Sequence, residues 1–396
     1  MAKDAITQTG QIIFSGQDIR VRLVPGGSHT LVVTFPASSA GNRLDRKGFA
    51  EALLAKENIA AAHVTVSFDH WFQTPETYQA LAAIREHARG FERVVTYGSS
   101  MGGYAAAVCS KALGAAAIIS ISPQFSIDPA KAPWDPRYLS HAKRILAGPG
   151  FLRDEMSELL CPDAEFHITY DPVMTSEQLH ATNLLTFSAN SMPLVIPFGG
   201  HPVGKTLAKA GLLKPWVLAA IHGKPAGDIR NKFREMRRNN ALWWTRLAIL
   251  ASRRRPALST FAAQTALRLA PQDKGVAFAV AMPLRRAGRV EEALSAYDTA
   301  CRLAPRSGKF RVERGRTLLQ MRRLSDAMAD FEKARDLGET RLALPALSEL
   351  HARMGRHAEA RAVAQDAVLV GANPSIHDRI EKLLAAAERQ SIRERQ

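Results

Sequence analysis

Cysteine is scarce in this chain. Its 396 residues include three cysteines, Cys109, Cys161 and Cys301, which lie far apart and form no Cys-x-x-Cys pair. A disulfide framework needs paired cysteines, and a structural zinc site needs closely spaced ligands. The sequence therefore predicts neither feature, and it implies no metal and no organic cofactor.

Long apolar runs are also missing. No stretch of about 18 apolar residues is free of charged residues, so we expect no membrane span. Residues 1–16 contain no basic segment followed by an apolar run, which is the pattern of a secretory signal. Both absences favour a cytoplasmic location.

Acidic residues are outnumbered, but only in one part of the chain. The net charge is +16, and residues 1–222 hold 19 basic against 18 acidic side chains, so the excess belongs to residues 223–396. A basic surface can attract nucleic acid, anionic lipid or an acidic protein. Here the basic residues alternate with Glu and Asp along the chain. We interpret them as a solvated helical face, which argues against nucleic acid as a partner.

The length and a hydrophobic content of 46% indicate two globular domains. In residues 1–222, short β-branched runs alternate with helical patterns such as 75–90 and 102–113. This alternation predicts a mostly parallel α/β sheet with flanking helices. Residues 123–162 are rich in Pro, Asp and aromatics, and we interpret them as a cap insertion. The predicted strands are Ile19–Leu23, Thr30–Phe35, His63–Phe68, Val94–Tyr97, Ala117–Ile121, Glu165–Tyr170 and Pro193–Pro197.

A repeat of 33 to 34 residues occupies the C-terminal part. The segment 287–294 recurs at 321–328 and again at 354–361. This period resembles the tetratricopeptide repeat, which implies an all-α solenoid over residues 240–396 that binds a partner protein or self-associates. A degenerate repeat at 243–271 contains Trp243 and Trp244. Residues 223–239 are predicted to be a linker.

One motif indicates chemistry. Gly98-Ser99-Ser100-Met101-Gly102 lies between a β-rich run and an Ala-rich helical run. In a Gly-x-Ser-x-Gly elbow the turn is so sharp that side chains two residues before and after the serine would clash. The context predicts that Ser100 is a nucleophile exposed above the sheet.

A nucleophilic serine needs a base and a carboxylate that orients the base, in the chain order Ser, Asp or Glu, His. Asp171 follows one predicted strand, and His201 follows the next. With the elbow, Tyr170-Asp171-Pro172 and Gly199-Gly200-His201 resemble the signature segments of the α/β-hydrolase superfamily. The resemblance implies Ser100 as nucleophile, His201 as general base and acid, and Asp171 as the orienting carboxylate.

Other residues compete for two of these roles. His180 is the rival base, although it comes soon after Asp171 within a helical stretch. Asp163 and Asp69 are weaker rivals for the acid. The oxyanion hole needs two backbone N–H groups. Met101 supplies one, and Ala37 or Ser38, in the loop after an earlier strand, is the candidate for the other.

A second motif overlaps the histidine. Residues 199–206 fit the P-loop pattern Gly-x-x-x-x-Gly-Lys-Ser/Thr, which would place Lys205 on phosphates and Thr206 on magnesium. Pro202 removes one of the backbone N–H groups that such a loop needs. We therefore keep a nucleotide binder only as an alternative.

The sequence thus predicts a serine hydrolase that acts on an acyl ester, thioester or amide through a Ser-His-Asp triad. The same triad would also serve an acyltransferase to a sugar or another hydroxyl. A non-catalytic scaffold with a hydrolase-like platform is a further alternative. The aromatic residues of the insertion, Phe125, Trp134, Tyr138 and Phe151, are expected either to roof the pocket or to form local core.

Overall fold

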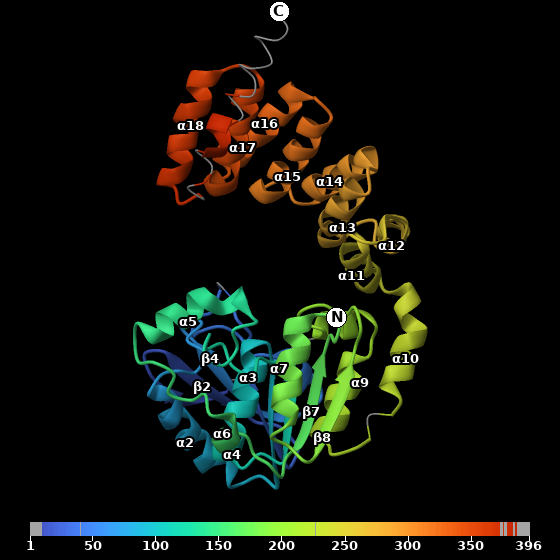
Figure 1. Cartoon of the computed structure of the whole chain (residues 1–396). Coiled ribbons are helices and arrows are strands. Elements are labelled where there is room, and N and C mark those ends of the chain that lie inside the picture. Colours follow the sequence, from blue (N-terminus) through green and yellow to red (C-terminus); the bar gives the residue numbers. More distant parts are fainter. Residues whose placement is uncertain are drawn as a thin grey trace, which may run out of the picture. The chain divides into compact units, whose positions relative to one another are not determined.

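The fold is taken from a computed structural model that describes residues 10–39, 41–225, 227–372, 375, 378–382 and 385 (Figure 1). The chain divides into two compact units, Met1–Asn240 and Ala241–Gln396.

The first unit is built on an eight-stranded sheet with the order β1-β2-β4-β3-β5-β6-β7-β8. β2 is antiparallel to both of its neighbours, and every other neighbouring pair is parallel. The strands are β1 (Gln11–Ser15), β2 (Ile19–Val24), β3 (Thr30–Phe35), β4 (Ala60–Val66), β5 (Arg93–Ser99), β6 (Ala117–Ile121), β7 (Glu165–Tyr170) and β8 (Ser191–Val195).

Helices flank this sheet. They are α1 (Glu51–Lys56), α2 (Glu76–Ala88), α3 (Met101–Val108), α4 (Ser110–Leu113), η1 (Pro136–Tyr138), α5 (Leu139–Leu146), α6 (Met156–Leu159), α7 (Thr175–Leu185), α8 (Gly204–Lys209), α9 (Leu213–Ile221), α10 (Ile229–Met236) and η2 (Arg237–Asn239). β4 and β6 are buried at every position, because helices on both faces exclude water from the sheet.

The predicted mostly parallel sheet with flanking helices is confirmed. The predicted strands of residues 30–35, 117–121 and 165–170 match β3, β6 and β7 residue for residue. β1 was missed, because it is a short edge strand whose three apolar residues run together without the alternation of a half-buried strand. β4 begins at Ala60 rather than His63, since three small alanines precede the β-branched run.

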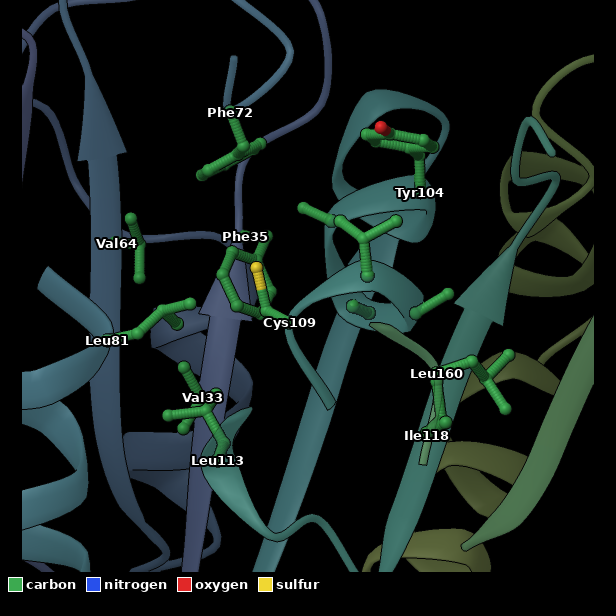
Figure 2. Close-up of a cluster of buried hydrophobic side chains, with 14 of the residues drawn as sticks. Val33, Phe35, Val64, Phe72, Leu81, Tyr104, Cys109, Leu113, Ile118 and Leu160 are labelled. Carbon is green, nitrogen blue, oxygen red and sulfur yellow. The ribbon is translucent and has the colours of Figure 1, made fainter. Parts of the chain in front are cut away.

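The hydrophobic core lies between the sheet and the helices that pack on it. Figure 2 shows Val33 and Phe35 on the same face of β3, with Leu81 of α2 lying beside them. The Phe35 ring meets Phe72 edge to face, with ring centroids 5.4 Å apart. Phe35 is the last residue of β3, so this packing also fixes where the following loop begins.

The segment expected as a linker differs from the expectation. It contains helix α10, whose Ile229 and Phe233 are buried. At its end, Asn240 Nδ2 donates a hydrogen bond to the Thr206 carbonyl at 3.0 Å. Residues 223–239 therefore contribute a packed helix to the first unit, which ends at Asn240 rather than at 222.

The second unit is a helical repeat region. Its antiparallel helices are α11 (Ala241–Ala251), α12 (Pro256–Leu269), α13 (Lys274–Arg286), α14 (Val290–Leu303), α15 (Gly308–Gln320), α16 (Leu324–Asp336), α17 (Thr340–Arg353) and α18 (His357–Leu369). The repeated segments each close a helix with a left-handed residue, Gly288, Arg322 or Gly355. Glycine recurs there because it adopts this backbone without strain. Among the described residues, no helix is long and apolar enough to cross a membrane.

The buried His63 of β4 makes stability depend on pH. Its Nδ1 lies 2.7 Å from Thr34 Oγ1, and burial lowers its pKa to about 4, although the nearby Glu51 charge opposes this. In the unfolded chain the histidine pKa returns to about 6.5. Between these values the unfolded chain binds a proton that the folded protein does not, so stability falls as the pH falls through this window.

We predict that His63→Gln removes on the order of 2 kcal/mol of the stability loss between pH 7 and pH 5. Urea unfolding of the full chain at both pH values measures this. His29→Gln is the control, because His29 is exposed. Equal pH dependence in wild type and His63→Gln would contradict the assignment.

Candidate active site

Ser100 occupies the turn between β5 and α3. Its backbone has φ 55° and ψ −121°, a conformation that L-residues rarely adopt. Such strain is typical of a serine held at the tip of a strand-to-helix turn. The turn places the Ser100 side chain at the carboxyl edge of the sheet, where 6% of the residue is exposed.

Two glycines make this turn possible. A Cβ atom on Gly98 would lie 2.0 Å from the Gly102 carbonyl oxygen, and one on Gly102 would lie 2.3 Å from the Phe35 carbonyl oxygen. No side chain fits at either position. The second contact also shows that the end of β3 runs directly against the turn that carries Ser100.

His201 reaches Ser100 from the loop after β8. Its Nε2 lies 3.0 Å from Ser100 Oγ, across 101 residues of sequence. The loop turns through left-handed backbone at Phe198 and Gly200. The predicted nucleophile and the predicted base are therefore brought within hydrogen-bond distance.

The carboxylate that meets His201 is Glu177, in the first turn of α7. Its Oε1 lies 2.6 Å from His201 Nδ1, and the Glu177 side chain is fully buried. Sequence reasoning missed this residue. A signal was present, because Glu177 lies on the apolar face of α7 at helical spacing from Ala181 and Leu184, where an acidic side chain is out of place.

Asp171, the predicted orienting carboxylate, takes a different place. It is fully buried and accepts hydrogen bonds from the backbone N–H groups of Val173 and Phe198, each at 3.0 Å, and of Gly200 at 2.9 Å. Its oxygens are directed to the backbone of the loop rather than to the His201 ring. Asp171 thus fixes the path of the loop that carries His201, and we correct the predicted contact accordingly.

A chain of charged side chains lies behind Glu177, in which Glu177 and Asp135 are buried and Arg137 is partly exposed. Arg137 Nη1 is 3.5 Å from Glu177 Oε1, while Nε and Nη2 of the same guanidinium donate to Asp135 at 2.7 and 2.6 Å. Asp135 also faces His180 Nε2 at 2.9 Å. Burial would raise the pKa of Asp135, but the hydrogen bonds from His180 and Arg137 outweigh it and hold this pKa well below its usual range.

His180, the rival base, is occupied in this network. Its Nδ1 accepts the Phe125 N–H at 3.1 Å, so the proton of the neutral ring is on Nε2 and faces Asp135. The two rival acids differ in their surroundings. Asp69 accepts hydrogen bonds from Ser38, Ser39 and Asn42, and Asp163 is exposed.

The insertion between β6 and β7 contributes one aromatic side chain to the site. Tyr138 Oη lies 3.3 Å from His201 Nε2, and burial raises the pKa of this phenol. The other aromatic residues pack elsewhere. Phe125 stacks on Phe187, Trp134 lies beside His180, and Phe151 packs against the core.

The oxyanion-hole candidates lie next to the turn. The N–H groups of Met101 and Ala37 have no hydrogen-bond acceptor within the part of the chain that the structure describes. The Ser38 hydroxyl donates to Asp69, and Asp69 also accepts the Ser39 N–H at 3.1 Å. Asp69 thus secures the loop that begins where β3 meets Gly102.

The segment with the P-loop pattern forms part of the His201 loop. Thr206 is buried and donates its hydroxyl to the Gly199 carbonyl at 2.7 Å, so the residue expected on magnesium is occupied. In the described ranges, no cluster of three or more His, Cys, Asp or Glu side chains is arranged to hold a metal ion.

Comparison with known proteins adds only partial likenesses. No protein-family model matches the chain, and no curated protein matches it in sequence. A thermophilic tetratricopeptide-repeat protein of Thermus thermophilus is 20% identical with a TM-score of 0.33, covering 44% of this chain and 99% of that chain. The capsule O-acetyltransferase of Neisseria meningitidis serogroup A is 14% identical with a TM-score of 0.39, covering 53% of this chain and 93% of that chain.

The role of Asp171 in the loop leads to a stability prediction. In Asp171→Asn, an amide NH₂ group replaces one carboxylate oxygen and faces a backbone N–H group that is also a donor. The loop thereby loses a charged hydrogen-bond acceptor. We expect a loss on the order of 2 kcal/mol and a melting temperature lower by about 5 °C. Asp163→Asn is the matched control, because Asp163 is exposed. An unchanged melting temperature for Asp171→Asn would contradict this role.

Proposed function

We propose that the first unit is a serine-nucleophile acyl-transfer enzyme of the α/β-hydrolase type, with Ser100, His201 and Glu177 as its triad. The observation that carries this proposal is the continuous line of contacts from Ser100 Oγ through the His201 ring to a buried carboxylate. The order Ser, Glu, His along the chain agrees with this class.

In the acylation step, Ser100 Oγ forms a bond to the acyl carbon of the substrate. The hydroxyl proton passes to His201 Nε2 and then to the leaving group, whose bond to the acyl carbon breaks. Glu177 accepts a hydrogen bond from Nδ1–H, which fixes the ring tautomer with its lone pair on Nε2 and stabilises the imidazolium. The buried position of Glu177 strengthens this interaction, because water does not compete for its Oε1.

The oxyanion formed on the acyl carbon needs donors that are already in place. We propose the N–H groups of Met101 and Ala37 for this role. Met101 begins α3, so the positive end of the helix dipole supports a negative charge there. Asp69 would keep the Ala37 loop in position through Ser38.

The acyl-enzyme would be released to an oxygen acceptor. Water gives hydrolysis of an ester, thioester or amide, and a sugar or other hydroxyl gives acyl transfer. We also propose that the helical repeats of the second unit bind a protein partner or self-associate, as stacked helical hairpins present a continuous surface.

The proposal predicts that Ser100 alone reacts covalently. A fluorophosphonate probe should label the wild-type chain and should leave Ser100→Ala unlabelled, as detected by intact mass. Ser157→Ala is the control and should label like wild type, because Ser157 is an exposed residue of α6. Absence of labelling in the wild type would instead support a non-catalytic scaffold.

The choice of Glu177 over Asp171 predicts a specific kinetic loss. Glu177→Gln presents an amide N–H₂ or a neutral oxygen to Nδ1 and disturbs the tautomer, so acylation by 4-nitrophenyl acetate should fall by about 10³ to 10⁴. The melting temperature should change little. Glu158→Gln, on the exposed side of α6, should react at the wild-type rate. A Glu177→Gln variant with wild-type acylation would exclude this carboxylate from the triad.

A further inference from the structure

Two hydroxyl groups face one nitrogen atom in this site. Ser100 Oγ and Tyr138 Oη lie 3.0 and 3.3 Å from His201 Nε2. The other ring nitrogen is occupied by Glu177, so the neutral ring has a single lone pair, on Nε2. The two hydroxyl groups therefore compete for the same acceptor.

The second half of an acyl-transfer reaction needs that acceptor for another oxygen. To deacylate the enzyme, a water or alcohol oxygen forms a bond to the acyl carbon and the bond to Ser100 Oγ breaks. The proton of the incoming oxygen passes to Nε2 and then to Ser100 Oγ. The incoming oxygen must lie within hydrogen-bond reach of Nε2. Tyr138 Oη occupies a position at that distance.

Tyr138 is held in place from two sides. Gln124 Nε2 donates a hydrogen bond to its hydroxyl at 3.2 Å, and the Trp71 ring packs against its ring with centroids 4.9 Å apart. Gln124 and Trp71 are both fully buried, so the two groups that contact Tyr138 are themselves held by packing. The hydroxyl stays protonated near neutral pH, because burial raises the pKa of Tyr138.

The helix that follows Tyr138 in the chain is less tightly packed than its ring. It ends η1 and is followed by α5, in which Ala142 and Ile145 are the buried residues. The remaining side chains of this short helix are exposed or half-buried. A displacement of α5 would therefore disturb few packed side chains, whereas a movement of η1 would also shift Arg137 and a movement of Trp71 would disturb the core.

We infer that Tyr138 guards the acceptor position and keeps water off the acyl-enzyme until an acceptor displaces it. This inference rests on the proposed function and deepens it. A single water replaces only the one hydrogen bond that Nε2 loses, while a bound alcohol brings further contacts that offset the displacement of Tyr138. The arrangement favours transfer to a hydroxyl-bearing acceptor over hydrolysis.

The test separates acylation from deacylation. The full-length protein is acetylated with 4-nitrophenyl acetate, and the loss of acetyl-enzyme in water is followed by intact mass. Wild type should accumulate acetyl-enzyme. Tyr138→Phe keeps the packed ring and removes the hydroxyl, so acylation should change by less than about 3-fold while hydrolysis of acetyl-enzyme rises by about 10-fold.

Two further variants complete the design. Tyr78→Phe is the matched control and should deacylate like wild type, because Tyr78 is half exposed and its hydroxyl donates to the Leu152 carbonyl at 3.2 Å. Gln124→Met removes the donor that holds Tyr138 Oη and should give a smaller rise in hydrolysis than Tyr138→Phe.

Each outcome decides a separate claim. Deacylation that is unchanged or slower in Tyr138→Phe would overturn the guarding role, and so would a wild type in which hydrolysis keeps pace with acylation. A merely structural role would slow both steps together. Failure of wild type to acylate at Ser100 would overturn the proposed function itself, and the guarding role with it.

Discussion

The strained backbone of Ser100 is the constraint on which the site depends. A residue with φ 55° between a strand and a helix requires a turn so tight that Gly98 and Gly102 meet, and the absence of a side chain at Gly102 lets the end of β3 approach. The strain is held by the packed sheet on one side and the helix on the other. The close approach of the end of β3 to Gly102 also brings the loop that contains Ala37 beside Ser100.

Three buried carboxylates surround the histidine loop, and each has a different set of donors. Asp171 accepts three backbone N–H groups, Glu177 meets the His201 ring, and Asp135 pairs with Arg137 and His180. Burial of a charge is costly unless donors replace the lost water. The donor sets explain why one carboxylate shapes the loop, another faces the ring, and the third holds the arginine.

The insertion between β6 and β7 is part of this arrangement. Its residues Asp135, Arg137 and Tyr138 follow one another within a single turn of chain, yet they reach both sides of His201: the first two behind Glu177 and the third at Nε2. In the proposed mechanism, this segment therefore supports the orienting carboxylate and also contacts the nitrogen that would exchange protons.

Short-range pattern determined much of this protein. The strand–turn–helix context of Ser100, the glycines around it, the position of His201 after the last strand and the 34-residue repeat all depend on neighbours in sequence, so they could be predicted without a structure. The tertiary structure decided which carboxylate meets His201. Asp171 and Glu177 are six residues apart, and the reach of each depends on the path of the loop at 196–203 and on the first turn of α7. The spacing of residues on α7 could mark Glu177 as a buried acid, but its contact with His201 is a long-range packing contact, which a local pattern does not encode.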